Sequence, residues 1–229
     1  PMPTPRSACA AAAGGLGQAP LRDAPVWVLG GTCEGAELCC AERLTASGAG
    51  QLCWQRMPAL ATARSGCAAA ATGDGRLYAL GGFLRGVSLR TAEAFDPDSG
   101  QWRELPPMRH ARSACAAAAS AAAIYVVGGE VHPRWSGAPL AEVERLDLAT
   151  LCWESLPQLP APRKWHAAAL VDGQLFVFGG HDGRGAVAVA EAFSPRTWQW
   201  CPALPRAGSV PAARICIGTR ETRTLQSGV

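Results

Sequence analysis

An internal repeat of about 50 residues is the feature that most constrains the fold of this chain. Four pairs of adjacent glycines, beginning at Gly30, Gly81, Gly128 and Gly179, lie 51, 47 and 51 residues apart in succession. Each pair follows a short apolar run, for example VWVLGG or IYVVGG. Self-similarity with a period of about 20–50 residues is typical of solenoids, propellers and other repeat arrays. Each repeat is therefore expected to form one structural unit, and the fold to consist of copies of that unit.

Further markers accompany each glycine pair in a constant order. An arginine opens each repeat, and a glutamate and then a tryptophan follow the glycines. The glutamate-to-tryptophan distance is 9 residues in the last three repeats and 12 in the first, and three tryptophan-to-arginine distances are 10 residues. The markers are Arg6, Arg64, Arg112 and Arg163; Glu42, Glu93, Glu144 and Glu191; and Trp54, Trp102, Trp153 and Trp200.

The alanine-rich stretch behind each arginine is predicted to be a strand. RSACAAAAS (112–120) has near copies at 6–14 and 64–72 and a weaker copy, RKWHAAALV, at 163–171. Alanine is the best helix former, but runs of 4–7 residues between turn signals favour strands. Asp74-Gly75 and Asp172-Gly173 are hairpin signals, because both residues of such a turn need positive φ. Each repeat therefore predicts a four-stranded antiparallel meander.

Several of these markers closely resemble the kelch repeat: the glycine pair, the spaced glutamate and tryptophan, and GGHDG at 179–183, over about residues 1–214. The resemblance implies an all-β, kelch-type β-propeller with about one blade per repeat. It divides the chain into a propeller segment, 1–218, and an unstructured C-terminal tail, 219–229. The expected repeats are about 1–57, 58–106, 107–157 and 158–205, with a partial fifth at 206–218. In kelch-like blades the first strand lines a central channel, where only small side chains such as alanine fit.

Four recognisable repeats leave two possibilities for the propeller, since kelch propellers usually have more blades. Four blades can close a ring. Alternatively, the chain is a fragment or splice product that forms an incomplete propeller, with exposed blade faces and strand edges that invite association.

The four arginines define the main predicted binding site. Each precedes an inner strand, so all four are expected at the same mouth of the channel, where guanidinium groups suit forked hydrogen bonds to acidic peptides. In kelch-like substrate adaptors the Arg-Ser pair at this position contacts acidic degron peptides, and the resemblance implies the same here. The other interpretation is that each arginine binds carbonyls or a glutamate of the neighbouring blade. The predicted residues are Arg6, Ser7, Arg64, Ser65, Arg112, Ser113 and Arg163; Lys164 replaces the serine of the last repeat.

The loops after the glycine pairs form a second predicted contact surface, because binding residues concentrate in loops. EVHPRWSG (130–137) carries His132, Arg134 and Trp135, and tryptophan and arginine are enriched in interaction hot spots. His181 lies in the corresponding loop of the fourth repeat. The alternative is an ordinary exposed loop with one tryptophan packed against the rim.

Residues that recur once per blade are otherwise expected to be structural. The glutamates should hydrogen-bond backbone at a blade interface, and the tryptophans should pack between adjacent blades. The recurring cysteines are expected to be small, buried and inert. They are Cys9, Cys67 and Cys115 on the inner strands, and Cys53 and Cys152 before the tryptophans.

Composition and motifs disfavour several other functions. The net charge is only +3 and the chain has no run of basic residues, which argues against nucleic-acid binding. No apolar run reaches the ~18 residues of a membrane span. The two tyrosines and four histidines show no metal-ligand spacing, and no G-x-S-x-G or P-loop motif occurs. No metal or other cofactor is therefore expected.

We expect a non-catalytic, cytoplasmic module that binds a partner protein or acidic peptide. The resemblance further implies the substrate-recognition part of a cullin-type ubiquitin ligase adaptor, although no BTB or BACK sequence lies within these 229 residues. The alternatives are a structural, actin-associated kelch scaffold and a propeller enzyme.

Overall fold

Four antiparallel sheets of four strands follow one another along the chain in the computed structural model, which describes residues 1–14, 24–46, 51–131 and 137–202. The described backbone contains strands and turns, and no helix there is long and apolar enough to cross a membrane. The predicted partial fifth repeat and tail lie outside the described residues. The first sheet comprises β1 (Ala10–Ala13), β2 (Val26–Leu29), β5 (Ala41–Ala46) and β6 (Leu52–Met57); the second, β7 (Ala68–Ala71), β8 (Leu77–Leu80), β11 (Ala92–Asp96) and β12 (Gln101–Leu105); the third, β13 (Ala116–Ala119), β14 (Ala123–Val127), β15 (Val143–Asp147) and β16 (Trp153–Leu156); the fourth, β17 (Ala167–Val171), β18 (Gln174–Phe178), β19 (Ala190–Ser194) and β20 (Gln199–Pro202).

Each sheet is one blade of a β-propeller, and within it every strand pairs with the next strand of the meander. The predicted all-β propeller fold is therefore confirmed. The Asp172-Gly173 turn has positive φ at both residues, as expected, whereas in the second blade Gly75 has positive φ and Asp74 does not. The second blade makes a longer turn, in which the Gly75 amide donates to the Thr72 carbonyl.

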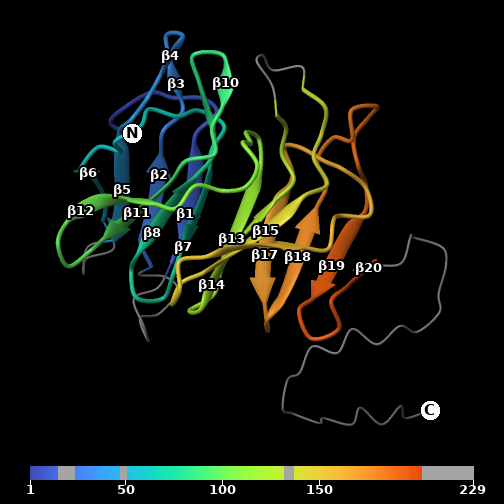
Figure 1. Cartoon of the computed structure of the whole chain (residues 1–229). Helices are drawn as coiled ribbons and strands as arrows, with labels where there is room; N and C mark the ends of the chain where they lie inside the picture. Colours follow the sequence, from blue (N-terminus) through green and yellow to red (C-terminus); the bar gives the residue numbers. More distant parts are fainter. Residues whose placement is uncertain (15–23, 47–50, 132–136, 203–229) are drawn as a thin grey trace, which may run out of the picture.

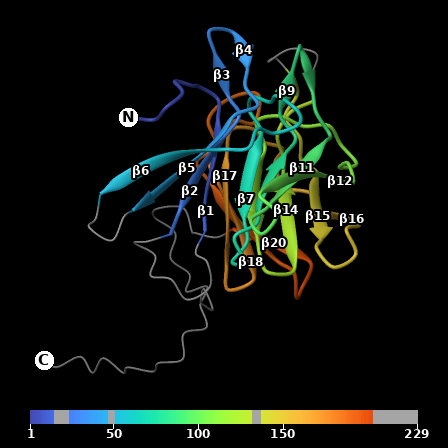
Figure 2. The ribbon, with the colours of Figure 1, turned by 90° about the vertical axis from the view of Figure 1, so that its left-hand side faces the viewer.

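The loops after the glycine pairs of the first, second and fourth blades project to one side of the propeller, which we call the loop side (Figures 1 and 2). In the first two blades these loops form short hairpins, β3 (Thr32–Cys33) with β4 (Ala36–Glu37) and β9 (Phe83–Leu84) with β10 (Val87–Ser88). In the second, third and fourth blades, the turns that join the first strand to the second and the third strand to the fourth lie at the opposite end, which we call the turn side.

The alanine-rich strands β1, β7, β13 and β17 lie side by side along the inner edge of the blades. Backbone hydrogen bonds join neighbouring blades beside these strands. The Gly66 amide donates to the Ala8 carbonyl (2.7 Å), Ala114 to Gly66 (2.8 Å) and Trp165 to Ala114 (2.9 Å). All four residues have positive φ, between 49° and 55°. Such a close approach requires small side chains on the inner strands, which accounts for the alanines.

Neighbouring blades pack through two apolar faces, which we call the forward face, toward the next blade, and the backward face, toward the previous one. Between the second and third blades, Tyr78 and Leu80 of the forward face pack with Ile124 and Leu146 of the backward face. The other two junctions repeat this arrangement. The outer tryptophans bridge the junctions, because their indole nitrogens donate to proline carbonyls of the preceding blade. These bonds are Trp102 to Pro58 (2.9 Å), Trp153 to Pro106 (2.7 Å) and Trp200 to Pro157 (2.9 Å).

The four blades form an arc in which β17 does not pack on β1 as the other inner strands pack on one another. The described residues therefore form an incomplete propeller rather than a closed four-bladed ring. Its two ends are the backward face of the first blade and the forward face of the fourth.

The cysteine prediction is correct for two residues and wrong for three. Cys67 and Cys115 are buried at blade junctions, and burial raises their pKa to about 12 and about 11. Cys9 holds the equivalent position in the first blade but is exposed, because no described blade packs against its backward side. Cys53 and Cys152 are also exposed, since they lie on or beside an outermost strand.

His166 occupies the inner-strand position that is cysteine in the other repeats. Its side chain is buried against the third blade, where a β-carbon on Gly128 would lie 2.8 Å from the imidazole. Burial, and secondarily the charge of Arg163, lower the pKa of His166 from 6.5 to about 4. The folded protein therefore resists protonation of this imidazole.

Lowering the pH from 7 to 5 should reduce the free energy of unfolding. The unfolded chain protonates His166 below pH 6.5, whereas the folded chain does so only near pH 4, so stability falls across this interval, by about 2 kcal/mol at pH 5. Urea denaturation at both pH values measures the change. His166→Cys restores the residue of the other repeats and should remove most of it; an unchanged pH dependence in this variant would contradict the assignment.

Candidate functional site

The four repeat arginines do not face the channel mouth, because their side chains are fully buried and bound within their own blades. Arg64 donates from Nη1 to the carbonyls of Gly81 (2.6 Å) and Thr91 (3.2 Å), and from Nη2 to Glu93 (2.5 Å). Arg6, Arg112 and Arg163 make the equivalent contacts to the glycine carbonyl and glutamate of their repeats.

The prediction that these arginines form a peptide-binding ring is therefore corrected. A guanidinium group that lies in the core, bonded to a carboxylate and to carbonyls, exposes no donor to a partner. The alternative, in which each arginine binds carbonyls or a glutamate of the neighbouring blade, named the right kinds of partner. In the structure, however, these carbonyls and the glutamate belong to the arginine's own blade. Ser65 and Ser113 are buried as well, and Ser7 is the exposed member of the three predicted serines.

Two of the glutamates, Glu93 and Glu144, connect their blade to the preceding one through backbone hydrogen bonds, as expected. Glu93 accepts the amides of Ala61 (2.7 Å) and Thr62 (3.1 Å), in the linker that leaves the first blade. Glu144 accepts the amides of Arg109 (2.7 Å) and His110 (3.2 Å) in the next linker. In the second and third blades, the arginine–glutamate pair thus fixes the linker, the glycine pair and the third strand of the blade together.

The glycine pairs complete each junction by admitting the arginine of the following blade. The Gly82 amide donates to the Arg112 carbonyl (2.8 Å), and the first and third junctions repeat this bond. A β-carbon on Gly81, whose φ is +61°, would lie 2.4 Å from that carbonyl oxygen. Glycine is needed here both for the left-handed backbone and for the close approach.

A cavity of about 560 Å³ opens on the loop side between the third and fourth blades. Its described lining includes Pro139, Lys164, Trp165, His181, Asp182 and Arg184. His181 is therefore the predicted binding residue that the structure places in a pocket. His132, Arg134 and Trp135 lie outside the described residues. We call this cavity the loop-side pocket.

Trp165 is the distinctive residue of this pocket. Its side chain is 56% exposed and lies edge-on to His181, with ring centroids 6.0 Å apart. The Lys164 ammonium lies 4.4 Å from the indole centroid and donates to Glu130 (2.7 Å), a cation–π arrangement that orients the ring. The equivalent positions are Ala8, Gly66 and Ala114, so RKW in place of RSA or RSG was the signal in the sequence that pointed to Trp165.

Charged groups of both signs border the indole. Asp182 accepts the amides of Arg184 and Gly185, both at 2.8 Å, and these bonds lower the pKa of its carboxyl. Arg184 is exposed, and among the described residues its guanidinium has no carboxylate partner. The pocket therefore offers an aromatic face and an available cation. The described residues contain no group of three or more His, Cys, Asp or Glu side chains that could hold a metal ion.

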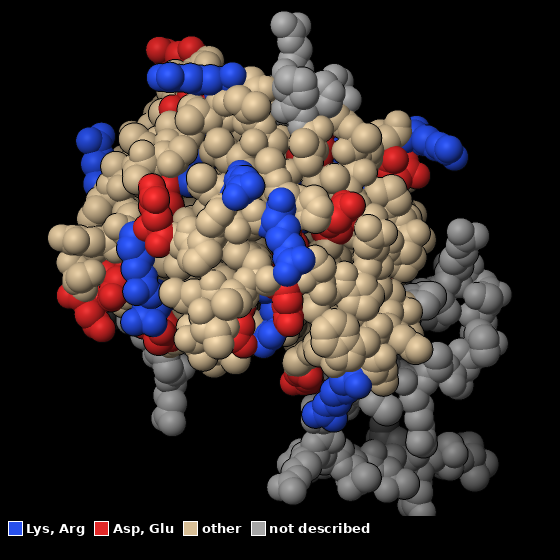
Figure 3. Space-filling view, viewed as in Figure 1, with Lys and Arg blue, Asp and Glu red and all other residues tan. Residues whose placement is uncertain are grey.

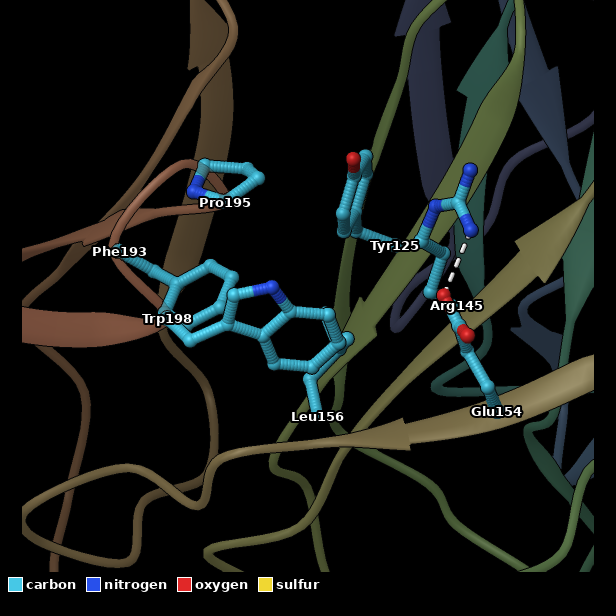
Figure 4. A pocket seen from close by; sticks show the side chains of 7 residues that line it. All are labelled: Tyr125, Arg145, Glu154, Leu156, Phe193, Pro195 and Trp198. Atoms are coloured by element: carbon cyan, nitrogen blue, oxygen red, sulfur yellow. Dashed lines mark hydrogen bonds and ion pairs between the residues drawn. The ribbon is translucent and has the colours of Figure 1, made fainter.

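A second cavity, of about 220 Å³, lies on the turn side of the same blade junction (Figure 4). Tyr125 of β14 faces Phe193 of β19 and Trp198 of the following turn, and the Arg145–Glu154 ion pair borders the cavity. Trp198 is 52% exposed and meets Phe193 edge-on, with centroids 6.3 Å apart. This rim pocket is suited to an apolar side chain.

The charges on the face in Figure 3 are dispersed, with basic and acidic side chains interspersed among uncharged residues. This view shows no large basic patch of the kind that nucleic acids require.

Arg112→Ala should lower the free energy of unfolding by about 3–5 kcal/mol, because it leaves Glu144 buried without its guanidinium partner. Arg145→Ala is the matched control, since the Arg145–Glu154 pair (2.6 Å) is partly exposed; its expected cost is about 0–1 kcal/mol. Urea denaturation compares the two variants with the wild type. Equal losses would show that the buried pair has no special role.

Comparisons with known proteins agree that this chain is similar to kelch-repeat proteins. The domain family described as "KLHDC2/KLHL20/DRC7 Kelch-repeats domain" matches residues 66–219. Human kelch-like protein 33 is 32% identical over 165 residues, which cover 68% of this chain and 30% of that protein. Human kelch repeat and BTB domain-containing protein 13 is 34% identical over 128 residues, covering 54% of this chain and 27% of that protein.

A plant protein and a solved structure are also similar to this chain. An F-box/kelch-repeat protein of Arabidopsis thaliana is 33% identical over 88 residues, covering 37% of this chain and 24% of its own. The chain thus spans less than a third of these curated relatives. The solved structure of YjhT has a TM-score of 0.71 at 14% identity and covers 91% of this chain and 68% of its own, which supports the fold. With four kelch-type blades and a family match over more than half of its length, the chain belongs to the kelch-repeat family.

Proposed function

We propose that this kelch propeller is a non-catalytic module that binds a segment of a partner protein in the loop-side pocket. The exposed indole of Trp165 is the observation that carries the proposal. A large aromatic ring on the surface costs hydration free energy unless a partner covers it, and tryptophan is the residue most enriched in interaction hot spots. Lys164 and His181 hold this ring in place from two sides.

The lining of the pocket favours a peptide with both an apolar and an acidic group. An apolar or proline side chain of the partner would stack on Trp165, and a carboxylate would pair with Arg184, which is exposed beside it. A forked guanidinium–carboxylate bond adds direction as well as energy. The proposal thus keeps an acidic peptide as the ligand but assigns it to the loop side rather than to the buried arginines.

We further propose that this binding serves substrate recognition in a cytoplasmic, cullin-type ubiquitin ligase adaptor. The support is the resemblance of the repeats to kelch-like adaptors and the names of relatives that combine kelch repeats with a BTB domain or an F-box. A cullin should then be recovered with the full-length protein but not with the propeller alone.

Trp165→Ala should weaken partner binding by about 2 kcal/mol or more, roughly 30-fold in Kd. Alanine already occupies this backbone conformation at Ala8 and Ala114, so the fold should tolerate it. Quantitative pull-down identifies proteins lost from the variant, and calorimetry with the recovered partner gives the Kd.

The matched control is Trp198→Leu, which removes the second exposed indole among the described residues and installs the residue of the third repeat, Leu151. This variant should bind the partner as the wild type does. Loss of binding in Trp198→Leu alone would move the site to the rim pocket. Arg184→Glu should weaken binding of an acidic partner, and unchanged affinity would exclude the carboxylate contact.

A further inference from the structure

The rim pocket lies at an internal blade junction, and the structure describes both of its walls. One wall is the forward face of the third blade, and the other is the backward face of the fourth blade (Figure 4). The loop-side pocket opens at the other end of the same junction. The proposed function makes no use of the rim pocket, so its purpose is a separate question.

The rim pocket exists because the fourth blade departs from the repeat. At the preceding junction, Leu148 and Leu151 of the third blade pack against the apolar core. The strand register places Pro195 and Trp198 at these two positions in the fourth blade. Proline has a smaller side chain than leucine, and Trp198 is not part of the core cluster at this junction. The space that two leucines fill at one junction is therefore left open at the next.

Trp198 has a backbone conformation that is unfavourable for a bulky residue. Its φ is +56°, in the left-handed region. The equivalent residues are Gly100, which adopts this conformation without strain, and Leu151, which shares it but packs against the core. Trp198 has neither advantage, because 52% of its surface is exposed. Strained residues of this kind cluster at binding and active sites.

A row of polar side chains forms the opposite wall. Tyr125, Arg145 and Glu154 lie opposite one another on neighbouring strands, so they share the forward face of the third blade. Arg145 pairs with both Glu154 (2.6 Å) and Asp147 (3.3 Å). Hydrogen bonds, first among them that from the Thr150 amide, hold the pKa of the Asp147 carboxyl below its ordinary value. Two carboxylates thus face one guanidinium group, which leaves an excess of one negative charge.

The carboxylates are more accessible than the guanidinium group between them. The side chain of Glu154 is 45% exposed, whereas that of Arg145 is 26% exposed. Arg196, in the same turn as Trp198, is exposed but does not line the pocket. A cationic group that approaches the rim pocket therefore meets carboxylate oxygens beside an aromatic surface.

We propose that the rim pocket binds a segment of a partner protein in which a large apolar side chain stands next to a lysine or arginine. The apolar side chain would enter between Trp198 and Tyr125, and a volume of about 220 Å³ accommodates one such group. The basic group would pair with Glu154 at the edge of the pocket. Burial of the apolar group supplies most of the affinity, and the charged contact mainly selects the partner.

The proposal gives the two ends of one junction opposite preferences. The loop-side pocket is proposed to take an acidic segment, and the rim pocket a basic one. The two sites share no lining residue. The rim-pocket proposal therefore does not rest on the proposed function.

A library of random peptides displayed on phage is the probe. Phage retained by the full chain are passed over the Trp198→Leu variant, and peptides that only the wild type retains are sequenced. These peptides should carry leucine, methionine, phenylalanine or tryptophan next to lysine or arginine. Enrichment of acidic peptides, or retention of the same peptides by both proteins, would overturn the proposal.

Fluorescence anisotropy with one selected peptide then gives the Kd. Trp198→Leu should weaken binding about 10-fold or more, because leucine should fill the space as Leu151 does at the preceding junction. Glu154→Lys should weaken binding about fivefold. Glu104→Lys is the matched control, because Glu104 is an exposed carboxylate on β12 of the second blade; it should leave the Kd unchanged.

Urea denaturation separates loss of binding from loss of folding. The unfolding midpoint of Trp198→Leu should match that of the wild type, since Leu151 adopts the same backbone conformation. A large decrease would show that Trp198 supports the fold and would contradict the proposal, as would an unchanged Kd in Glu154→Lys. Loss of peptide binding in Trp165→Ala would assign the peptide to the loop-side pocket instead, so the two proposals fail separately.

Discussion

The buried arginine–glutamate pair is the interaction on which the rest of this structure depends. One guanidinium group joins the inner strand of a blade to its glycine pair and its third strand, and the glutamate then holds the incoming linker. The carbonyl of the same arginine binds the previous blade. Because the charges are buried, neither partner can be removed without leaving the other uncompensated. The repeat markers are therefore the parts of one joint.

The residues of this joint hold the blades together and differ from the residue that we propose binds a partner. The recurring arginines, glutamates, glycine pairs and outer tryptophans pack the blades against one another, so they are not available to bind a partner. The residue two positions after the arginine is not constrained in that way. It is alanine or glycine in three blades and Trp165 in the fourth, with the same backbone conformation throughout. The propeller thus presents variable side chains at its mouth without changing its core.

The sequence was sufficient for the fold but only partly for the site. Four markers in constant order predict blades, because each marker has one structural task per repeat. The prediction of an arginine ring at the channel mouth was wrong because residue spacing places the backbone near the mouth but does not determine whether the side chain points into the channel or into the core of the blade. Glu93 and its counterparts, expected at a blade interface, are what draw those side chains into the core. Trp165 was overlooked because it breaks the pattern, although a break in a repeat is where function is expected.

The bonds between Ala8, Gly66, Ala114 and Trp165 have a consequence for how the molecule opens. Each bond crosses one blade boundary, so each of the three donating amides reports the separation of a single pair of neighbours. In a linear array, stability is close to a sum of unit and nearest-neighbour terms. Hydrogen–deuterium exchange at these amides would then resolve the boundaries individually. Fraying from the ends would appear as faster exchange at Gly66 and Trp165 than at Ala114.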